Sequence, residues 1–187
     1  MLIYSKVRIH FDIEVGMKKM AITNKTLLQS LPNAEMCKKI PVLLEKHYGI
    51  QMANIWKFGI NTGLRLSEML TIKLENISGK KALITINKTR NDEMQEIFLP
   101  SEARELINSI RKAHPGSKYL FQSYRSRNVI NKKSTPVTRQ AVSLAFRGVG
   151  EILGIPLSPH MMRQIHIVQS IDQLDPSERK LIEFYLT

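Results

Sequence analysis

Residues 157–164 read LSPHMMRQ, a stretch with the pattern of a helix beginning. Ser158 is a favoured N-cap residue and Pro159 suits the first helical position. We therefore expect His160 and Arg163 to share one face of the first turn. A helix N-terminus already presents free N–H groups and a partial positive charge. Two further cationic or proton-carrying side chains there predict a binding site for an anion.

The composition narrows the choice of anion. The 187 residues include 28 Lys and Arg against 16 Asp and Glu, a formal net charge of +12. Such an excess favours nucleic acid as partner, with an anionic membrane as the rival and a structural or ribosomal RNA role as a third reading. No apolar run is long enough to span a bilayer, and the charged N-terminus does not read as a signal peptide. The single cysteine, Cys37, suits a reducing compartment, so we expect a cytoplasmic protein without membrane association.

Hydrophobic spacing predicts a mainly helical α+β domain with a small antiparallel sheet. Helical patterns run from residue 24 onward and are expected to break at Pro32, Pro41 and Gly49, and Gly63 is positioned to end a buried helix. Two β-rich runs, 82–87 and 95–99, predict a hairpin around a polar turn.

Capping residues define the later helices. Ser101 is expected to cap a helix over 102–114, and Thr138 a helix over 139–153 that ends at Gly154. We expect a basic lead-in over residues 1–21 and one folded domain over 22–187.

Four places in the chain could carry chemistry, and each has a less specific alternative. Arg65 and Glu68 follow a glycine turn, and a surface pair at this spacing is common. Lys88 is expected at the tip of the hairpin, and a lysine in a turn is usually solvated. His160 and Arg163 could be incidental polar residues of a capped helix. Tyr185, near the end of the sequence, would more often serve packing.

Taken in chain order, Arg65, Lys88, His160, Arg163 and Tyr185 resemble the catalytic set of the tyrosine recombinases, the phage integrase family. The stretch TGLRLSEML (62–70) is similar to the first-arginine box of that family, and LSPHMMR (157–163) to its His-x-x-Arg box. Lys88 matches the hairpin lysine. The resemblance covers roughly residues 22–187 and implies a tyrosine-recombinase catalytic-domain fold.

The resemblance also implies a reaction and its partners. Tyr185 would attack a DNA phosphodiester to give a 3′-phosphotyrosyl link. Arg65 and Arg163 would hold the non-bridging oxygens with planar donor forks, so that no metal or other cofactor is needed. Lys88 would protonate the leaving 5′-oxygen, His160 would carry a proton near the phosphate, and Glu68 would hold Arg65. The implied partner is double-stranded DNA, with a homo-tetramer on paired sites and a monomer in solution.

The C-terminal part departs from the family pattern. Tyr185 follows Arg163 by only 22 residues, and the Leu-Gly-His box is absent. Gln164 stands where a second histidine is common. His166 is either a substitute for it or a buried or solvated histidine. Tyr185 is either the nucleophile on a shortened tail or a residue outside the site, which would then have no nucleophile. Tyr119 and Tyr124 are alternative nucleophiles in principle.

A basic segment over residues 118–139 provides the predicted DNA-binding surface, because it has six Lys or Arg and no acid in 22 residues. The ordinary alternative is a solvated loop. The candidates within it are Lys118, Arg125, Arg127, Lys132, Lys133 and Arg139. Further lysines and arginines that could extend the surface are Lys73, Lys80, Lys81 and Arg90.

Three functional hypotheses follow. The first is an enzyme that cuts and rejoins DNA in site-specific recombination, encoded by a mobile element such as a phage or plasmid. The second is a relative that has lost catalysis and modulates DNA sites by binding alone. The third is a basic structural or RNA-associated protein, which should bind RNA at least as well as duplex DNA.

Overall fold

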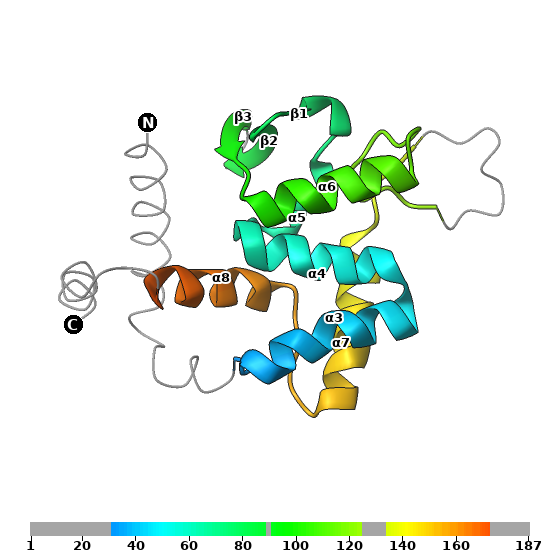
Figure 1. The fold of residues 1–187 in the computed structure, drawn as a ribbon, viewed down its shortest axis with the longest axis vertical. Coiled ribbons are helices and arrows are strands. Elements are labelled where there is room, and N and C mark those ends of the chain that lie inside the picture. The colour runs from blue at the N-terminus through cyan, green and yellow to red at the C-terminus, as the bar shows by residue number, and fades with distance from the viewer. Residues whose placement is uncertain (1–30, 89–90, 125–133, 173–187) are drawn as a thin grey trace.

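The computed structural model describes residues 31–88, 91–124 and 134–172, with the side chains of 86–88, 91–93 and 171–172 left out. In this part of the chain, helices surround one core and a small antiparallel sheet lies on one side (Figure 1). The helices are α3 (Ala34–Tyr48), α4 (Ile50–Thr62), α5 (Leu66–Thr71), the 3₁₀ helix η1 (Leu74–Asn76), α6 (Ser101–Ala113), α7 (Arg139–Leu153) and α8 (His160–Asp172). The predicted mainly helical α+β class is confirmed.

Helix α4 is the central element, because α3, α6 and α8 all pack against it (Figure 1). Its apolar residues recur on more than one face, which a helix enclosed by neighbours requires. Trp56 is completely buried and meets Phe146 of α7 edge-on, with ring centroids 5.8 Å apart. Phe58 makes a similar contact with Phe121, with centroids at 5.6 Å. These aromatic pairs fix α4 against two segments that come much later in the sequence.

The sheet confirms the predicted hairpin and extends it. Strands β2 (Lys81–Lys88) and β3 (Asn91–Phe98) pair from Lys81↔Phe98 to Lys88↔Asn91, so residues expected in the turn belong to strands. A short strand, β1 (Ile77–Ser78), pairs antiparallel with β2. Ala82, Ile84 and Ile97 are buried. The hairpin is thus anchored to the domain through one face, and α5 packs against β2.

Pro41 does not interrupt the first described helix, contrary to the sequence prediction. It lies inside α3, which continues to Tyr48 and ends at Gly49 with φ 93°. A proline within a helix removes one backbone hydrogen bond. Ile40 and Leu44 lie on either side of it and are completely buried, so core packing offsets that loss. The helix predicted ahead of Pro32 lies largely outside the described residues.

The predicted helix ends at Thr138 and Gly154 are confirmed, as is Gly63 at the end of α4, and one predicted cap is wrong. The Thr138 hydroxyl accepts a 3.1 Å hydrogen bond from the N–H of Ala141 at the start of α7, and Gly154 ends that helix in the left-handed conformation. Ser101 is instead the first residue of α6, after Pro100 at the N-cap. The helix thus begins one residue earlier than predicted, and the Ser101 hydroxyl donates to the neighbouring Glu102 carboxylate.

Helix α8 begins one residue later than predicted. His160 is its first residue, and the N–H groups of Met161 and Met162 donate to the carbonyls of Ser158 and Pro159 three residues earlier. This tight first turn still places His160 and Arg163 one turn apart. None of the helices in the described residues has the length and apolar character needed to cross a bilayer.

Candidate active site

Arg65 is held by Glu68 through both its backbone and its side chain. Arg65 is the N-cap of α5, and its backbone N–H donates to Oε2 of Glu68 at 2.8 Å. Its Nη1 donates to the other carboxylate oxygen, Oε1, at 3.0 Å. One carboxylate therefore caps the helix and orients the guanidinium at the same time.

The two partners of this pair differ in solvent contact. The Glu68 side chain is only 7% exposed, whereas that of Arg65 is 61% exposed. A buried carboxylate needs hydrogen-bonding partners, and Glu68 receives them from Arg65. The remaining donors of the Arg65 guanidinium are therefore available on the solvent side for an anionic ligand.

Arg163 reaches the same turn from a distant part of the sequence. Its Nη1 donates a 2.8 Å hydrogen bond to the carbonyl oxygen of Gly63, two residues before Arg65. Gly63 ends α4 with φ 63°, and carbonyl groups at a helix C-terminus attract cations. The structure thus brings the two predicted arginine boxes together at the α4–α5 turn.

His166, one turn after Arg163, makes a second bond between α8 and the end of α4. Its Nδ1 lies 2.9 Å from the carbonyl oxygen of Ile60. Because a carbonyl only accepts hydrogen bonds, Nδ1 must carry the proton in the neutral ring. Burial lowers the pKa of His166, the bond to Ile60 opposes this shift, and the nearby charge of Arg163 adds to the lowering.

Close packing at two glycines lets α8 approach α4. A Cβ on Gly63 would overlap the ring of His166, whose Cγ and Nε2 would lie at 3.0 Å, and a Cβ on Gly59 would collide with Met162. Met162 is completely buried in this interface. Met162 and His166, which flank Arg163 in the sequence, are therefore packed against the backbone of α4, which restricts the movement of α8.

His160 lies exposed at the first residue of α8, one turn before Arg163. This spacing puts both side chains on one face at the N-terminal end of the helix, where the first N–H groups also point. That the LSPHMMR stretch binds an anion stays a prediction.

The remaining catalytic candidates lie wholly or partly outside the described residues. Lys88 is the last residue of β2 and pairs with Asn91, but its side chain lies outside the described part. Tyr185 lies outside the described residues altogether, as does the predicted boundary between residues 21 and 22. Both catalytic assignments and the boundary stay predictions.

The basic segment is described at its two ends. Lys118 is exposed, and its carbonyl accepts a bond from the N–H of Leu74. Arg139 is exposed at the first residue of α7. The candidates Arg125, Arg127, Lys132 and Lys133 lie outside the described residues, as does Arg90. Among the additional lysines, Lys73 pairs with Glu75 at 3.5 Å and Lys81 pairs with Glu96 at 2.7 Å.

The alternative tyrosines have contacts near the C-terminal end of α6 and the segment after it. The Tyr124 ring stacks on His114 with centroids 4.3 Å apart, and its hydroxyl hydrogen bonds with Ser117. Tyr119 forms a β-bridge with Lys73. Both tyrosines thus have packing contacts of their own.

The sequence interpretation missed the role of two backbone carbonyls. The Gly63 carbonyl accepts a hydrogen bond from Arg163, and the Ile60 carbonyl accepts one from His166. A sequence pattern contains no signal for such backbone partners. The spacing of His160 and Arg163 did indicate a shared helix face. Among the described residues, no group of three His, Cys, Asp or Glu side chains is placed to hold a metal ion.

The helices packed around α4, the hairpin beside them and the meeting of two arginine boxes at Gly63 together define the catalytic-domain fold of an integrase. Comparison with known proteins agrees: the sequence pattern of the phage integrase family matches residues 33–170. The chain belongs to the phage integrase family.

Individual relatives extend this result. The chain is 30% identical over 140 residues to the tyrosine recombinase XerA of Pyrococcus furiosus, a match over 74% of this chain and 46% of that protein. It is 24% identical over 112 residues to XerA of Saccharolobus solfataricus, over 60% and 34% of the two chains. The chain thus spans less than half the length of these curated relatives.

Solved structures share the fold at low sequence identity. The lambda integrase catalytic core superposes with a TM-score of 0.62 at 16% identity, covering 84% of this chain and 90% of that one. The Tn1549 transposon integrase in complex with circular intermediate DNA gives a TM-score of 0.59 at 13% identity, covering 81% and 56%.

Proposed function

We propose that this chain is the catalytic domain of a site-specific DNA recombinase, which cuts and rejoins strands through a 3′-phosphotyrosyl intermediate. The observation that carries the proposal is the hydrogen bond from Arg163 to Gly63, because it brings the second arginine box to the first. Family membership and the net charge of +12 support duplex DNA as the substrate.

The proposed reaction assigns a role to each candidate residue. The hydroxyl oxygen of Tyr185 forms a bond to phosphorus, and the bond from phosphorus to the 5′-oxygen breaks. Arg65 and Arg163 offer donors to the two non-bridging oxygens, where negative charge accumulates in the transition state. Lys88 gives a proton to the leaving 5′-oxygen, and His160, the proton carrier near the phosphate, takes the proton that the Tyr185 hydroxyl releases.

Glu68 acts on the reaction through Arg65. Its carboxylate fixes the guanidinium before DNA binds, so less conformational freedom is lost when the phosphate arrives. The exposed residues Lys118 and Arg139, with the basic residues between them, would contact the backbone of the duplex.

We further propose that four copies act on paired DNA sites and that the free protein is a monomer. Among the solved integrases of this fold are a lambda integrase dimer bound to a COC′ core site and a tetramer bound to a Holliday junction. These assemblies belong to those proteins and support the proposal for this chain by similarity of fold.

A nicked suicide substrate tests the proposal. The preferred site is first selected from random duplexes, and the enzyme is then mixed with that site carrying a nick next to the cleavage point, so that the short 5′ fragment diffuses away. We expect a covalent protein–DNA adduct that Tyr185→Phe abolishes and Tyr124→Phe leaves intact. Binding to the duplex without an adduct would instead mean that the chain is a relative that binds DNA without cutting it. Tighter binding to RNA than to duplex DNA would contradict both the recombinase and the DNA-binding relative.

A further inference from the structure

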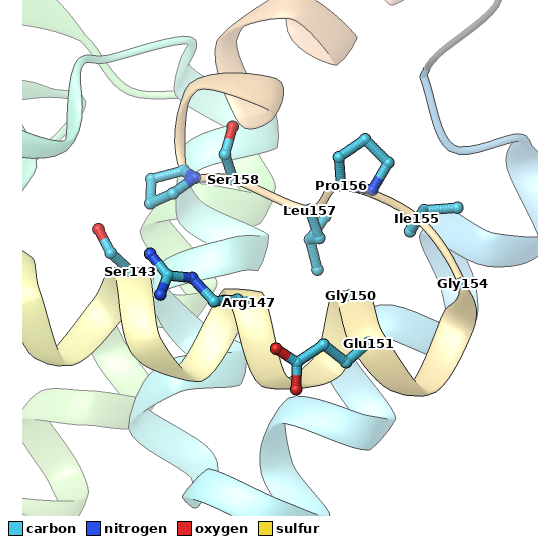
Figure 2. Close-up of a pocket in the computed structure, with 10 residues that line it drawn as sticks. Ser143, Arg147, Gly150, Glu151, Gly154, Ile155, Pro156, Leu157 and Ser158 are labelled. Atoms are coloured by element: carbon cyan, nitrogen blue, oxygen red, sulfur yellow. The ribbon is translucent and has the colours of Figure 1, made fainter.

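A pocket of about 560 Å³ lies between α7 and the segment that leads into α8 (Figure 2). Its lining includes Ser143 and Arg147 from α7, and Ser158 and Pro159 from the segment before His160. The pocket therefore directly adjoins the first residue of α8 but contains none of the proposed catalytic residues. A water occupies roughly 30 Å³, so the space exceeds what a single phosphate ion would fill.

The polar groups of the pocket are arranged unevenly. Ser143 and Arg147 are one turn apart on α7, and Figure 2 shows the hydroxyl and the guanidinium extending from the same face of the helix toward the segment that carries Ser158. Glu151, one further turn along α7, also lines the pocket. An anion is therefore attracted to the Arg147 end and repelled from the Glu151 end.

The opposite wall of the pocket is fastened to α7. The N–H of Ile155 donates to the carbonyl of Gly150 at 2.9 Å. A Cβ on Gly150 would lie 2.6 Å from the carbonyl oxygen of Ile155 and 2.9 Å from Cβ of Leu157, so only glycine allows this approach. The wall, which also includes Pro156, supplies an apolar surface suited to a sugar ring.

The pocket continues a polar stripe along α7. Arg139, Ser143 and Arg147 follow one another at intervals of four residues and so share one face of the helix. Arg139 and Arg147 are both exposed, and the stripe is about 12 Å long at 1.5 Å per residue. Phosphates of one DNA strand follow each other every 3.4 Å or so along the duplex axis, so several lie within this length.

We infer that the pocket binds a second, uncut phosphate of the same DNA, with its sugar against Pro156 and its oxygens on Arg147 and Ser143. This inference rests on the proposed function, because the occupant is the duplex whose cut phosphate lies at His160 and Arg163. The contact fixes the position of the duplex relative to α8 and carries no base information.

Equilibrium binding of the full 187-residue chain to its selected duplex, measured from 50 to 300 mM salt, tests the inference. Arg147→Ala should weaken binding about tenfold at 100 mM salt and lower the slope of log affinity against log salt by about 1. Arg147→Lys should keep most of the slope but lose part of the affinity, since it keeps the charge without the fork. Ser143→Ala should weaken binding a few-fold at unchanged slope.

Lys112→Ala is the matched control, because it removes one exposed positive charge from α6 and does not line the pocket. We expect it to change affinity and slope far less than Arg147→Ala. Equal losses in the two variants would overturn the inference and leave the proposed function standing. If the wild-type chain does not bind duplex DNA, both the proposed function and this inference are wrong. Every variant must also melt at a temperature close to that of the wild type, so that lost binding is not a loss of folding.

A second arm distinguishes the source of the phosphate. Binding is repeated with vesicles containing 30% phosphatidylglycerol and with inorganic phosphate as a competitor of the duplex. We expect Arg147→Ala to affect duplex binding and to have no larger effect on vesicles than Lys112→Ala. The inference would be overturned if Arg147→Ala weakened binding to vesicles but not to the duplex. It would also be overturned if millimolar inorganic phosphate filled the pocket without displacing the duplex.

Discussion

Arg163 and Gly63 are a hundred residues apart in the sequence and are joined by a 2.8 Å hydrogen bond between the guanidinium and the carbonyl oxygen. Gly63 in turn precedes Arg65 by two residues. This bond ties Arg163 to the turn that carries Arg65 before any ligand arrives. An enzyme that holds its positive charges in place has less reorganisation to complete in the transition state.

The guanidinium fork of Arg163 is therefore expected to matter more than its charge. Arg163→Lys keeps the charge but loses the planar donors that can serve Gly63 and a phosphate oxygen together. We expect adduct formation on the suicide substrate to slow by roughly 10²-fold or more, with a smaller loss in duplex affinity. Single-turnover kinetics at saturating protein measure the first quantity. An unchanged rate would remove Arg163 from the proposed site.

Glu68 is predicted to control Arg65 through position. Glu68→Ala removes the acceptor of both the Arg65 backbone N–H and its guanidinium, and it should lower the free energy of unfolding by about 1–2 kcal/mol, mainly through the lost cap. Glu68→Gln retains an oxygen for the backbone bond and should cost less stability.

Both Glu68 variants should slow adduct formation because Arg65 becomes free to move. Chemical denaturation measures the stability, and single-turnover cleavage measures the rate. Glu75→Gln provides a control, since that exposed carboxylate pairs with Lys73 at the surface and such pairs contribute little. A Glu68→Gln enzyme as fast and as stable as wild type would contradict the prediction.

Gly63→Ala should destabilise the protein for two separate reasons. Its φ of 63° is unfavourable for alanine by about 1–2 kcal/mol, and the added Cβ would overlap His166. Gly154→Ala separates the backbone strain from the collision with His166. Gly154 also ends a helix at positive φ, 68°, but an added Cβ there has nothing within 4 Å. Thermal unfolding should show a larger loss for Gly63→Ala. Equal losses would mean that α8 adjusts to the extra atom.

His166 makes the stability depend on pH in a defined direction. Its pKa is lowered in the folded protein from the ordinary value of 6.5, first by burial and also by the charge of Arg163. Below pH 6.5 the unfolded chain therefore binds the proton more readily, and the stability present above that pH is lost as the pH falls through the folded-state pKa.

His166→Asn tests this dependence, because an amide N–H can still donate to Ile60 but does not titrate between pH 5 and 8. We expect the difference in melting temperature between pH 7.5 and pH 5.5 to shrink in this variant. His47→Gln, an exposed histidine on α3, should keep the wild-type difference. If His166→Asn retains the full difference as well, the pH dependence arises elsewhere.

Local chemistry determined what could be read from the sequence. Helix ends at Gly63, Thr138 and Gly154 depend on side chains and φ angles within a few residues, and they were predicted correctly. The hairpin followed from two short β-rich runs around a polar turn. The arginine boxes, being contiguous motifs, identified the family that the comparisons then confirmed.

Tertiary structure decided everything that depends on distant partners. Pro41 remains inside a helix because the core holds its neighbours. The carbonyl that holds Arg163, and the pocket at Arg147, exist only where α4, α7 and α8 meet. Backbone carbonyls are the same in every residue, so no side-chain pattern marks which of them a folded chain will bring to a cation.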